Sequence, residues 1–207
     1  MSESAPTELL IATHNAGKVR ELEPLLDGLP WRLRSLAEFP EVLEVEETGS
    51  TFAENAALKA CGYAAQTRLW TLADDSGLEV DALGGAPGVL SARYGGEGAS
   101  DAGRTARLLA ELARTDDRHR RARFVCVIAI TDAAARLVHT SMGTCEGSIA
   151  LAPRGERGFG YDPVFIPDGY EETFGELPPD IKQRISHRAR ALEAARSFLL
   201  DYFRPPA

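Results

Sequence analysis

The sequence predicts an α/β fold in which strands and helices are mixed within one domain. Segments with strand patterns are interleaved with segments that carry helix-capping signals, and glycine-rich loops follow several of the expected strands. The 207 residues are enough for one sizeable core, and the sequence contains no internal repeat, low-complexity segment or long linker. We therefore expect a single domain over 1–207, with loose ends at 1–7 and 204–207.

The N-terminal elements rest on apolar patterns and on two helix caps. Asn15 is a good N-cap, so a helix should begin there. The segment from Thr51 to Glu54 is a capping box, in which each side chain accepts a hydrogen bond from the other residue's backbone N–H. The elements expected here are a strand at 9–13, a helix at 15–26, a strand at 31–36, an acidic loop at 38–50 and a helix at 51–67.

The rest of the chain has longer loops between its expected elements. A short strand at 70–73 ends at the sequence Asp-Asp-Ser-Gly over 74–77, and the pattern leaves open whether 78–82 continue it. The remaining elements are a glycine-rich loop at 84–98, a helix at 100–113, strands at 122–131 and 136–146 paired through the turn at 132–135, a second glycine-rich loop at 152–162, a strand at 163–166 and a helix at 186–202. Loops at strand ends are where α/β proteins place functional groups.

The composition argues against several classes of protein. Apolar residues make up 44% and charged residues 26%, as in soluble globular proteins. No apolar stretch is long enough to span a bilayer, and the polar start has no signal-peptide pattern, so we expect no membrane partner. The cysteines Cys61, Cys126 and Cys145 form no CxxC pair, which argues against a disulfide framework or a zinc site and indicates the cytoplasm. The net charge of −8 argues against a nucleic-acid polymer as partner.

Lysine is scarce in this chain. Of the 23 basic residues only three are lysine, namely Lys18, Lys59 and Lys182. The lysine ammonium is a compact point charge that arginine does not replace at a tight site, so these three are candidate functional positions. The alternative is that a coding bias toward arginine left them by chance.

Residues 13–18 connect an expected strand to an expected helix. The free N–H groups and the dipole at a helix start favour an anion, and Lys18 adds a full positive charge there. The alternative is a plain capped helix with an exposed lysine.

The acidic segment 46–49 is followed by a helix with two polar residues on one face. Asn55 and Lys59 are four residues apart and therefore share that face. Glu54 is explained as the capping-box acid, whereas Glu47 has no such explanation. The alternative is a solvated acidic loop.

Asp74 and Asp75 are adjacent acids, placed by the pattern at the end of a strand. Such a pair suits a metal better than a strand, because Mg²⁺ commonly takes one or two carboxylates together with phosphate oxygens. Apolar residues on both sides would bury the acids, which favours this interpretation over an Asp-rich turn ending at Gly77.

Two segments near the C-terminus suggest a ligand pocket. In 158–163, glycines allow close approach to the backbone, and an aromatic ring beside a carboxylate can stack on a base and accept a hydrogen bond from its edge. An aromatic-anchored loop is the alternative. Ser186 is an expected N-cap, which puts His187 and Arg188 in a first turn where the dipole disfavours cations. An electronegative ligand would reconcile that conflict.

Residues 98–105 nearly match the P-loop pattern, with Arg104 in place of the lysine. A P-loop directly follows a buried strand, whereas residues 91–97 are polar and glycine-rich. We therefore reject a P-loop here and expect Ser100 or Asp101 to cap a helix.

Taken in order, these segments resemble the inosine/xanthosine triphosphate pyrophosphatase family, whose members remove deaminated purine nucleotides. The resemblance covers nearly the whole chain, and all three lysines fall where that family has lysine. His14 stands where relatives often have glycine, at a position expected to tolerate change. The matching segments are the Thr-X-Asn-X-X-Lys start, EETGSTFAENAALKA, LADDSGLEVDALGGAPGVLSARY, GFGYDP and ISHR.

The resemblance implies a two-lobed α/β domain with a central mixed sheet flanked by helices, a long substrate cleft, and a homodimer. It implies Mg²⁺-dependent hydrolysis of ITP, dITP, XTP and dXTP to the monophosphate and pyrophosphate, which keeps these nucleotides out of DNA and RNA. Asp75 is the implied proton acceptor with Asp74 supporting it, and the implied Mg²⁺ ligands are Glu47 and Asp75. The implied substrate-binding residues are Thr13, His14, Asn15, Ala16, Gly17, Lys18, Asn55, Lys59, Ser76, Phe159, Gly160, Tyr161, Asp162, Lys182, His187 and Arg188.

The chemistry of the residues agrees with this reaction. Hydrolysis between the α- and β-phosphates needs positioning, charge neutralisation and a deprotonated nucleophile. Lys18 and Lys59 would neutralise phosphate oxygens, and Mg²⁺ would bridge phosphates and acidify water. Whether Asp75 is a base, a metal ligand or both stays open.

The base preference can be argued from hydrogen bonding. Hypoxanthine and xanthine carry a 6-oxo acceptor, so donors such as Lys182, His187 or Arg188 would be left unpaired by ATP. We assign the exclusion of GTP, which differs from ITP by the 2-amino group, to the loop 159–162.

Two alternatives remain open at this point. One is a related nucleotide pyrophosphatase that acts on modified pyrimidines. The other is a nucleotide-binding module without catalysis, which would not need paired acids beside three lysines.

Overall fold

A computed structural model of the protein describes residues 7–96, 98–115 and 119–202. The first of its two compact units comprises the residues up to Asp75, Val127–Met142 and the residues from Ala191, and the second comprises Ser76–Cys126 and Gly143–Arg190. The expected loose ends lie outside the described residues except for Thr7, whose carbonyl oxygen accepts a hydrogen bond from the Arg32 N–H at 3.0 Å. Among the described helices, none has the length and apolar character that a membrane crossing requires.

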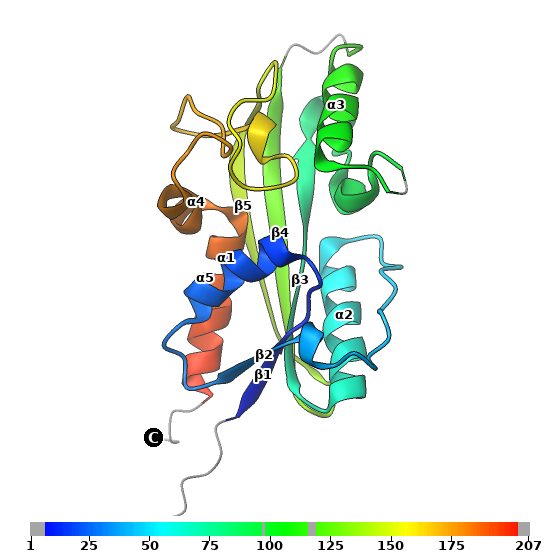
Figure 1. Cartoon of the computed structure of the whole chain (residues 1–207), viewed down its shortest axis with the longest axis vertical. Coiled ribbons are helices and arrows are strands. Elements are labelled where there is room, and N and C mark those ends of the chain that lie inside the picture. Colours follow the sequence, from blue (N-terminus) through cyan, green and yellow to red (C-terminus); the bar gives the residue numbers. More distant parts are fainter. Residues whose placement is uncertain (1–6, 97, 116–118, 203–207) are drawn as a thin grey trace, which may run out of the picture. The chain divides into compact units, whose positions relative to one another are not determined.

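The strands form one sheet in the order β2-β1-β3-β4-β5-β6 (Figure 1). Strand β1 pairs in parallel with β2 and β3, whereas β5 and β6 are antiparallel. The sheet is therefore mixed, which confirms the expected α/β class. The strands are β1 (Glu8–Ile11), β2 (Arg32–Ser35), β3 (Trp70–Val80), β4 (Arg121–Thr131), β5 (Leu137–Ile149) and β6 (Phe165–Pro167).

The first unit packs three helices on its strands. In Figure 1, α1 and α5 lie on one side of these strands and α2 lies on the other. Arg196 of α5 donates hydrogen bonds to the backbone at the end of α1, and Thr131 of β4 donates one to the Ala60 carbonyl of α2. The helices are α1 (Ala16–Leu26), α2 (Phe52–Thr67) and α5 (His187–Asp201), which begins in the second unit.

The predicted helix starts are confirmed. The Asn15 side chain accepts hydrogen bonds from the first turn of α1, and both halves of the capping box between Thr51 and Glu54 are present in α2. Ser100 caps the helix Asp101–Leu112, which begins inside the rejected P-loop segment. Ser186 accepts a hydrogen bond from the Ala189 N–H at the start of α5.

The second unit surrounds a separate apolar core. The pairing of β5 with β6 brings Phe165 into this core, where its ring lies 4.6 Å from that of Phe124. The core residues are Leu78, Val80, Tyr94, Leu108, Leu112, Ala122, Phe124, Cys145, Ile149, Tyr161, Val164, Phe165, Phe174 and Leu177. Its helices are α3 (Asp101–Leu112) and α4 (Pro179–Ile185), with 3-10 turns η2 (Asp81–Leu83), η3 (Gly88–Arg93) and η4 (Asp162–Val164); the first unit has η1 (Leu36–Glu38).

The structure differs from the expected elements at three places. The continuation that the sequence left open is present: strand β3 runs through Asp74 and Asp75 to Val80, and lysines of α1 and α2 pair with the two acids. The segment expected as a strand at 163–166 begins with the turn η4 before β6. Helix α4 was not expected, because its seven residues are too few for a helical period to show.

Gly147 sets the distance between β5 and β6, so we expect Gly147→Ala to destabilise the fold by about 1–3 kcal/mol. An added Cβ would lie 2.2 Å from the Ile166 carbonyl oxygen, which belongs to the backbone of β6. The same change at Gly103 in α3 meets no atom closer than 3.5 Å and should be neutral or stabilising. Urea unfolding of both variants provides the measurement. Equal stability of the two would contradict the close approach.

Candidate functional site

Each of the three lysines lies against an acid. In the first unit, Lys18 Nζ is 2.9 Å from Asp74 Oδ2. Lys59 Nζ is 3.2 Å from Asp75 Oδ1 and 3.0 Å from Glu47 Oε1. These charged side chains form one group, which we call the acid–lysine cluster. They come from the first turn of α1, the buried face of α2, the loop before α2 and strand β3.

Burial and neighbouring charges together set the pKa values of Asp75 and Lys59 in this cluster. Burial raises the pKa of Asp75 above its ordinary value, and the charge of Glu47 adds to this rise, while Lys59 and Lys18 offset it only in part. For Lys59, burial lowers the pKa, but the attraction of the surrounding acids outweighs burial and raises it. The cluster therefore combines a permanent ammonium with a carboxylate that accepts a proton more readily than usual.

The acids have a donor set that suits a divalent cation. Asp75 Oδ2 is buried and accepts no hydrogen bond from any described residue, and Glu47 reaches the same ammonium as Asp75. Hard cations such as Mg²⁺ prefer carboxylate oxygens. The described residues contain no group of three or more His, Cys, Asp or Glu side chains arranged to hold a metal. A cation here would therefore complete its shell with water or phosphate oxygens, as Mg²⁺ commonly does.

The predicted phosphate turn has its polar groups near the start of α1. Thr13 Oγ1 accepts a hydrogen bond from the Asn15 N–H at 3.2 Å. His14 and Ala16 are exposed, whereas Gly17, in the first turn of α1, is buried. These residues form the helix start that the sequence predicted, and their contact with a substrate stays a prediction.

Asn55 has a structural contact that the sequence did not suggest. It is buried, and its Oδ1 accepts a hydrogen bond from the Gly49 N–H at 2.8 Å. Asn55 thereby fixes the loop that carries Glu47, two residues before Gly49. Because Lys59 is buried on the same helix, the expected shared face is confirmed.

The second unit contains a second group of charged side chains, around residues 158–162. We call the segment 158–162 the aromatic loop. Asp162 Oδ2 accepts a hydrogen bond from the Phe159 N–H at 2.8 Å and lies 2.5 Å from Lys182 Nζ. Gly158 has a φ of +78°, and a Cβ there would lie 2.0 Å from Asp162 Oδ2. Only glycine fits at this position, so the carboxylate can lie directly beneath the loop.

Two cations flank the ring of Phe159. Lys182 Nζ lies 4.9 Å from the ring centroid and Arg188 Cζ lies 5.8 Å from it. Arg188 is only 2% exposed, and it donates a hydrogen bond to Ser76 Oγ at 2.9 Å. Ser76 directly follows Asp75 in the sequence of strand β3.

Tyr161 and His187 have core contacts in this structure. The Tyr161 hydroxyl donates to the Ser91 carbonyl oxygen at 3.0 Å, and burial raises the pKa of that hydroxyl strongly. The His187 ring stacks on Phe124 with centroids 4.7 Å apart. Both residues therefore pack within the second unit, and their contact with a purine stays a prediction.

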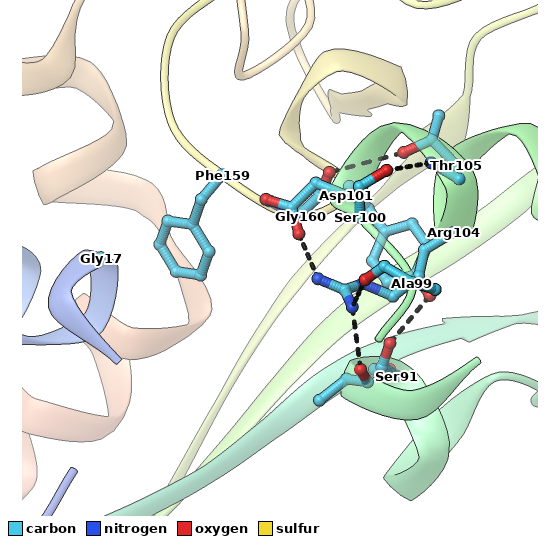
Figure 2. Close-up of polar contacts among 12 residues, drawn as sticks. Gly17, Ser91, Ala99, Ser100, Asp101, Arg104, Thr105, Phe159 and Gly160 are labelled. Carbon is cyan, nitrogen blue, oxygen red and sulfur yellow. Dashed lines mark hydrogen bonds and ion pairs between the residues drawn. The ribbon is translucent and has the colours of Figure 1, made fainter. Parts of the chain in front are cut away.

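The structure adds two residues of the rejected P-loop segment, Asp101, which was expected only as a possible helix cap, and Arg104. Asp101 Oδ2 accepts a hydrogen bond from the Gly160 N–H at 2.7 Å, and Asp101 Oδ1 is paired with Arg104 (Figure 2). The near P-loop pattern marked this segment, but only the fold reveals that it contacts a loop nearly 60 residues away.

Comparison with known proteins gives consistent matches over the chain. The sequence profile of the Ham1 family matches residues 9–198. A dITP/XTP pyrophosphatase from Desulforamulus reducens is 50% identical over 93% of this chain and 95% of the relative, and one from Bacillus subtilis is 46% identical over 93% and 96%. The structure of a HAM1 protein from Coxiella burnetii has a TM-score of 0.87 at 44% identity, covering 94% of this chain and 99% of that one.

Proposed function

Because the chain belongs to the Ham1 family, we propose that it hydrolyses deaminated purine nucleoside triphosphates to the monophosphate and pyrophosphate. The observation that carries this proposal is the acid–lysine cluster, in which Lys18 and Lys59 lie against Asp74, Asp75 and Glu47. The relatives from Desulforamulus reducens and Bacillus subtilis are dITP/XTP pyrophosphatases, which supports the same reaction and substrate class.

The lysines and Asp75 divide the chemistry between them. Lys18 and Lys59 exchange their carboxylate partners for phosphate oxygens and neutralise the charge that develops in the transition state. A water oxygen adds to phosphorus, the P–O–P linkage between the α- and β-phosphates breaks, and Asp75 takes up the proton of the water. The raised pKa of Asp75 favours that last step.

We further propose that Glu47 and Asp75 hold a Mg²⁺ ion together with the substrate. When bound, Mg²⁺ neutralises phosphate charge and lowers the pKa of a bound water. The buried Asp75 Oδ2, which accepts no hydrogen bond from any described residue, supports this assignment.

The aromatic loop is proposed to select the base. Lys182 and Arg188 would donate hydrogen bonds toward the 6-oxo group, and the Phe159 ring would contact the purine. ATP presents an amino donor at the position where these residues would need an acceptor, so the hydrogen bonds to the base would be lost. The loop 159–162 would exclude the 2-amino group of GTP.

Pyrophosphate release from ITP, XTP, dITP, ATP, GTP and dUTP, each with Mg²⁺ and with a chelator, tests the function. We expect release from the first three to exceed that from the others by about 10²-fold or more, and chelation to abolish it. Equal turnover of all six would retain the hydrolase and overturn the base pocket. Binding without turnover would favour a regulatory module, and preference for dUTP would favour a pyrimidine enzyme.

We also propose a homodimer, which the family resemblance implies, and a cytoplasmic location, which the cysteine pattern indicates. Sedimentation equilibrium at micromolar concentration tests the dimer, and a monomer under these conditions would contradict it.

A further inference from the structure

The backbone of the aromatic loop is held by carboxylates at two consecutive residues. The Phe159 N–H donates to Asp162 within the loop, whereas the Gly160 N–H donates to Asp101 of α3. Thr105, one turn further along α3, has its Oγ1 3.5 Å from the Gly160 carbonyl oxygen. Helix α3 therefore contacts both polar groups of Gly160 (Figure 2).

The acceptor at Asp101 is itself held in place. Arg104 pairs with Asp101 Oδ1 and also donates to the carbonyl oxygens of Ala99 at 2.6 Å and Ala92 at 3.0 Å. One guanidinium thus ties the start of α3 to the end of η3 and leaves Asp101 Oδ2 for the loop. A hydrogen bond from an N–H to an ionised acceptor is stronger than one to a neutral acceptor.

The backbone of Gly160 is adapted to this contact. Its φ is +61°, a conformation that costs glycine little and that side chains rarely adopt. The Gly160 N–H that donates to Asp101 belongs to the peptide group between Phe159 and Gly160. This hydrogen bond therefore restrains Phe159, whose ring lies beside Lys182 and Arg188.

We propose that Asp101, oriented by Arg104, is a positioning residue that fixes the Phe159–Gly160 peptide and thereby sets the selectivity for the purine base. The proposal rests on the proposed function, because base selectivity is one of its readouts. Asp101 acts through the aromatic loop and does not touch the substrate. The segment 98–105, which nearly matches the P-loop pattern, thus supports the loop that contacts the base and does not bind the phosphates.

The test compares Asp101→Asn with the wild-type enzyme, using kcat and KM for ITP and GTP. Asparagine retains the size of the side chain but loses its charge and the ion pair with Arg104. We expect the ITP-over-GTP ratio of kcat/KM to fall about 10-fold, mainly through a higher KM for ITP, with kcat changed less than about 3-fold. Hydrogen exchange at the Gly160 amide should accelerate at least about 10-fold in the same variant.

Asp168→Asn is the matched control. It removes an aspartate of similar exposure, 54% against 45%, that is also paired with an arginine, Arg121, and has no contact with the loop among the described residues. We expect its selectivity and its Gly160 exchange to equal those of the wild-type protein.

The outcomes separate this proposal from the proposed function. A selective wild-type enzyme whose Asp101→Asn variant retains the full ratio overturns the positioning role, as does an equal loss in Asp168→Asn. A wild-type protein without ITP hydrolysis overturns the proposed function instead. In that case hydrogen exchange at the Gly160 amide still tests the positioning role. An unchanged exchange rate in Asp101→Asn would overturn that role.

Discussion

Asp75→Asn is expected to lower kcat for ITP by about 10³-fold, because the variant can neither accept the proton of the attacking water nor offer a charged ligand to Mg²⁺. Pyrophosphate release at saturating ITP and Mg²⁺ measures this loss. Retention of more than about a tenth of the activity would remove Asp75 from the proposed chemistry.

The same variant should be at least as stable as the wild-type protein at neutral pH. The pKa of Asp75 is raised by burial, so the folded protein favours its neutral form, which asparagine imitates. An acid with a raised pKa contributes stability at low pH that is lost as the pH rises through its folded-state pKa. The gain in Tm from Asp75→Asn should therefore be largest at neutral pH and shrink as the pH is lowered toward that pKa.

Asp132→Asn provides a control in which the expected change in Tm has the opposite sign. The pKa of Asp132 is lowered by hydrogen bonds from the backbone and side chain of Arg136, so the folded protein favours its charged form. This substitution should lower Tm at neutral pH and leave turnover unchanged. If both variants lost stability equally, burial would not dominate the environment of Asp75.

Asp162→Ala is expected to reduce both stability and base selectivity. It removes the carboxylate beside the buried Lys182 ammonium and the acceptor of the Phe159 N–H. Breaking one partner of a buried ion pair costs about 3–5 kcal/mol, which urea unfolding would detect. The ITP-over-GTP ratio should fall as well, because the aromatic loop loses its internal support.

Adding Lys182→Met to this variant separates charge from packing. The double variant should recover part of the stability, since no uncompensated charge is left in the apolar surroundings. It should not recover selectivity, because the donor proposed for the 6-oxo group is gone. Full ITP-over-GTP preference in Asp162→Ala would contradict the role of the loop in excluding GTP.

Local signals explain what the sequence predicted well. The caps at Asn15 and Thr51 act over three or four residues, so the sequence alone determines them. The scarcity of lysine marked Lys18, Lys59 and Lys182, and the fold places each against an acid. The sequence therefore predicted which lysines are functional candidates, but it did not predict which acid each lysine pairs with.

The missed features depend on contacts between distant segments. A strand is an unfavourable place for adjacent acids, and β3 accommodates Asp74 and Asp75 only because α1 and α2 supply ammonium groups. Asp101 was expected only as a possible helix cap, and its contact with Gly160 follows from the packing of α3 against a loop far along the chain. No pattern within either segment contains that information.

The pairing of every lysine with an acid also decides how this protein responds to acylation. Any reagent or modifying enzyme that attacks a lysine amine must reach Lys18, Lys59 or Lys182, because the chain has no other lysine. For Lys59 the raised pKa keeps the amine protonated and poorly nucleophilic. The chain has no lysine away from the two groups of charges. Each lysine that is acylated therefore removes a positive charge from one of them.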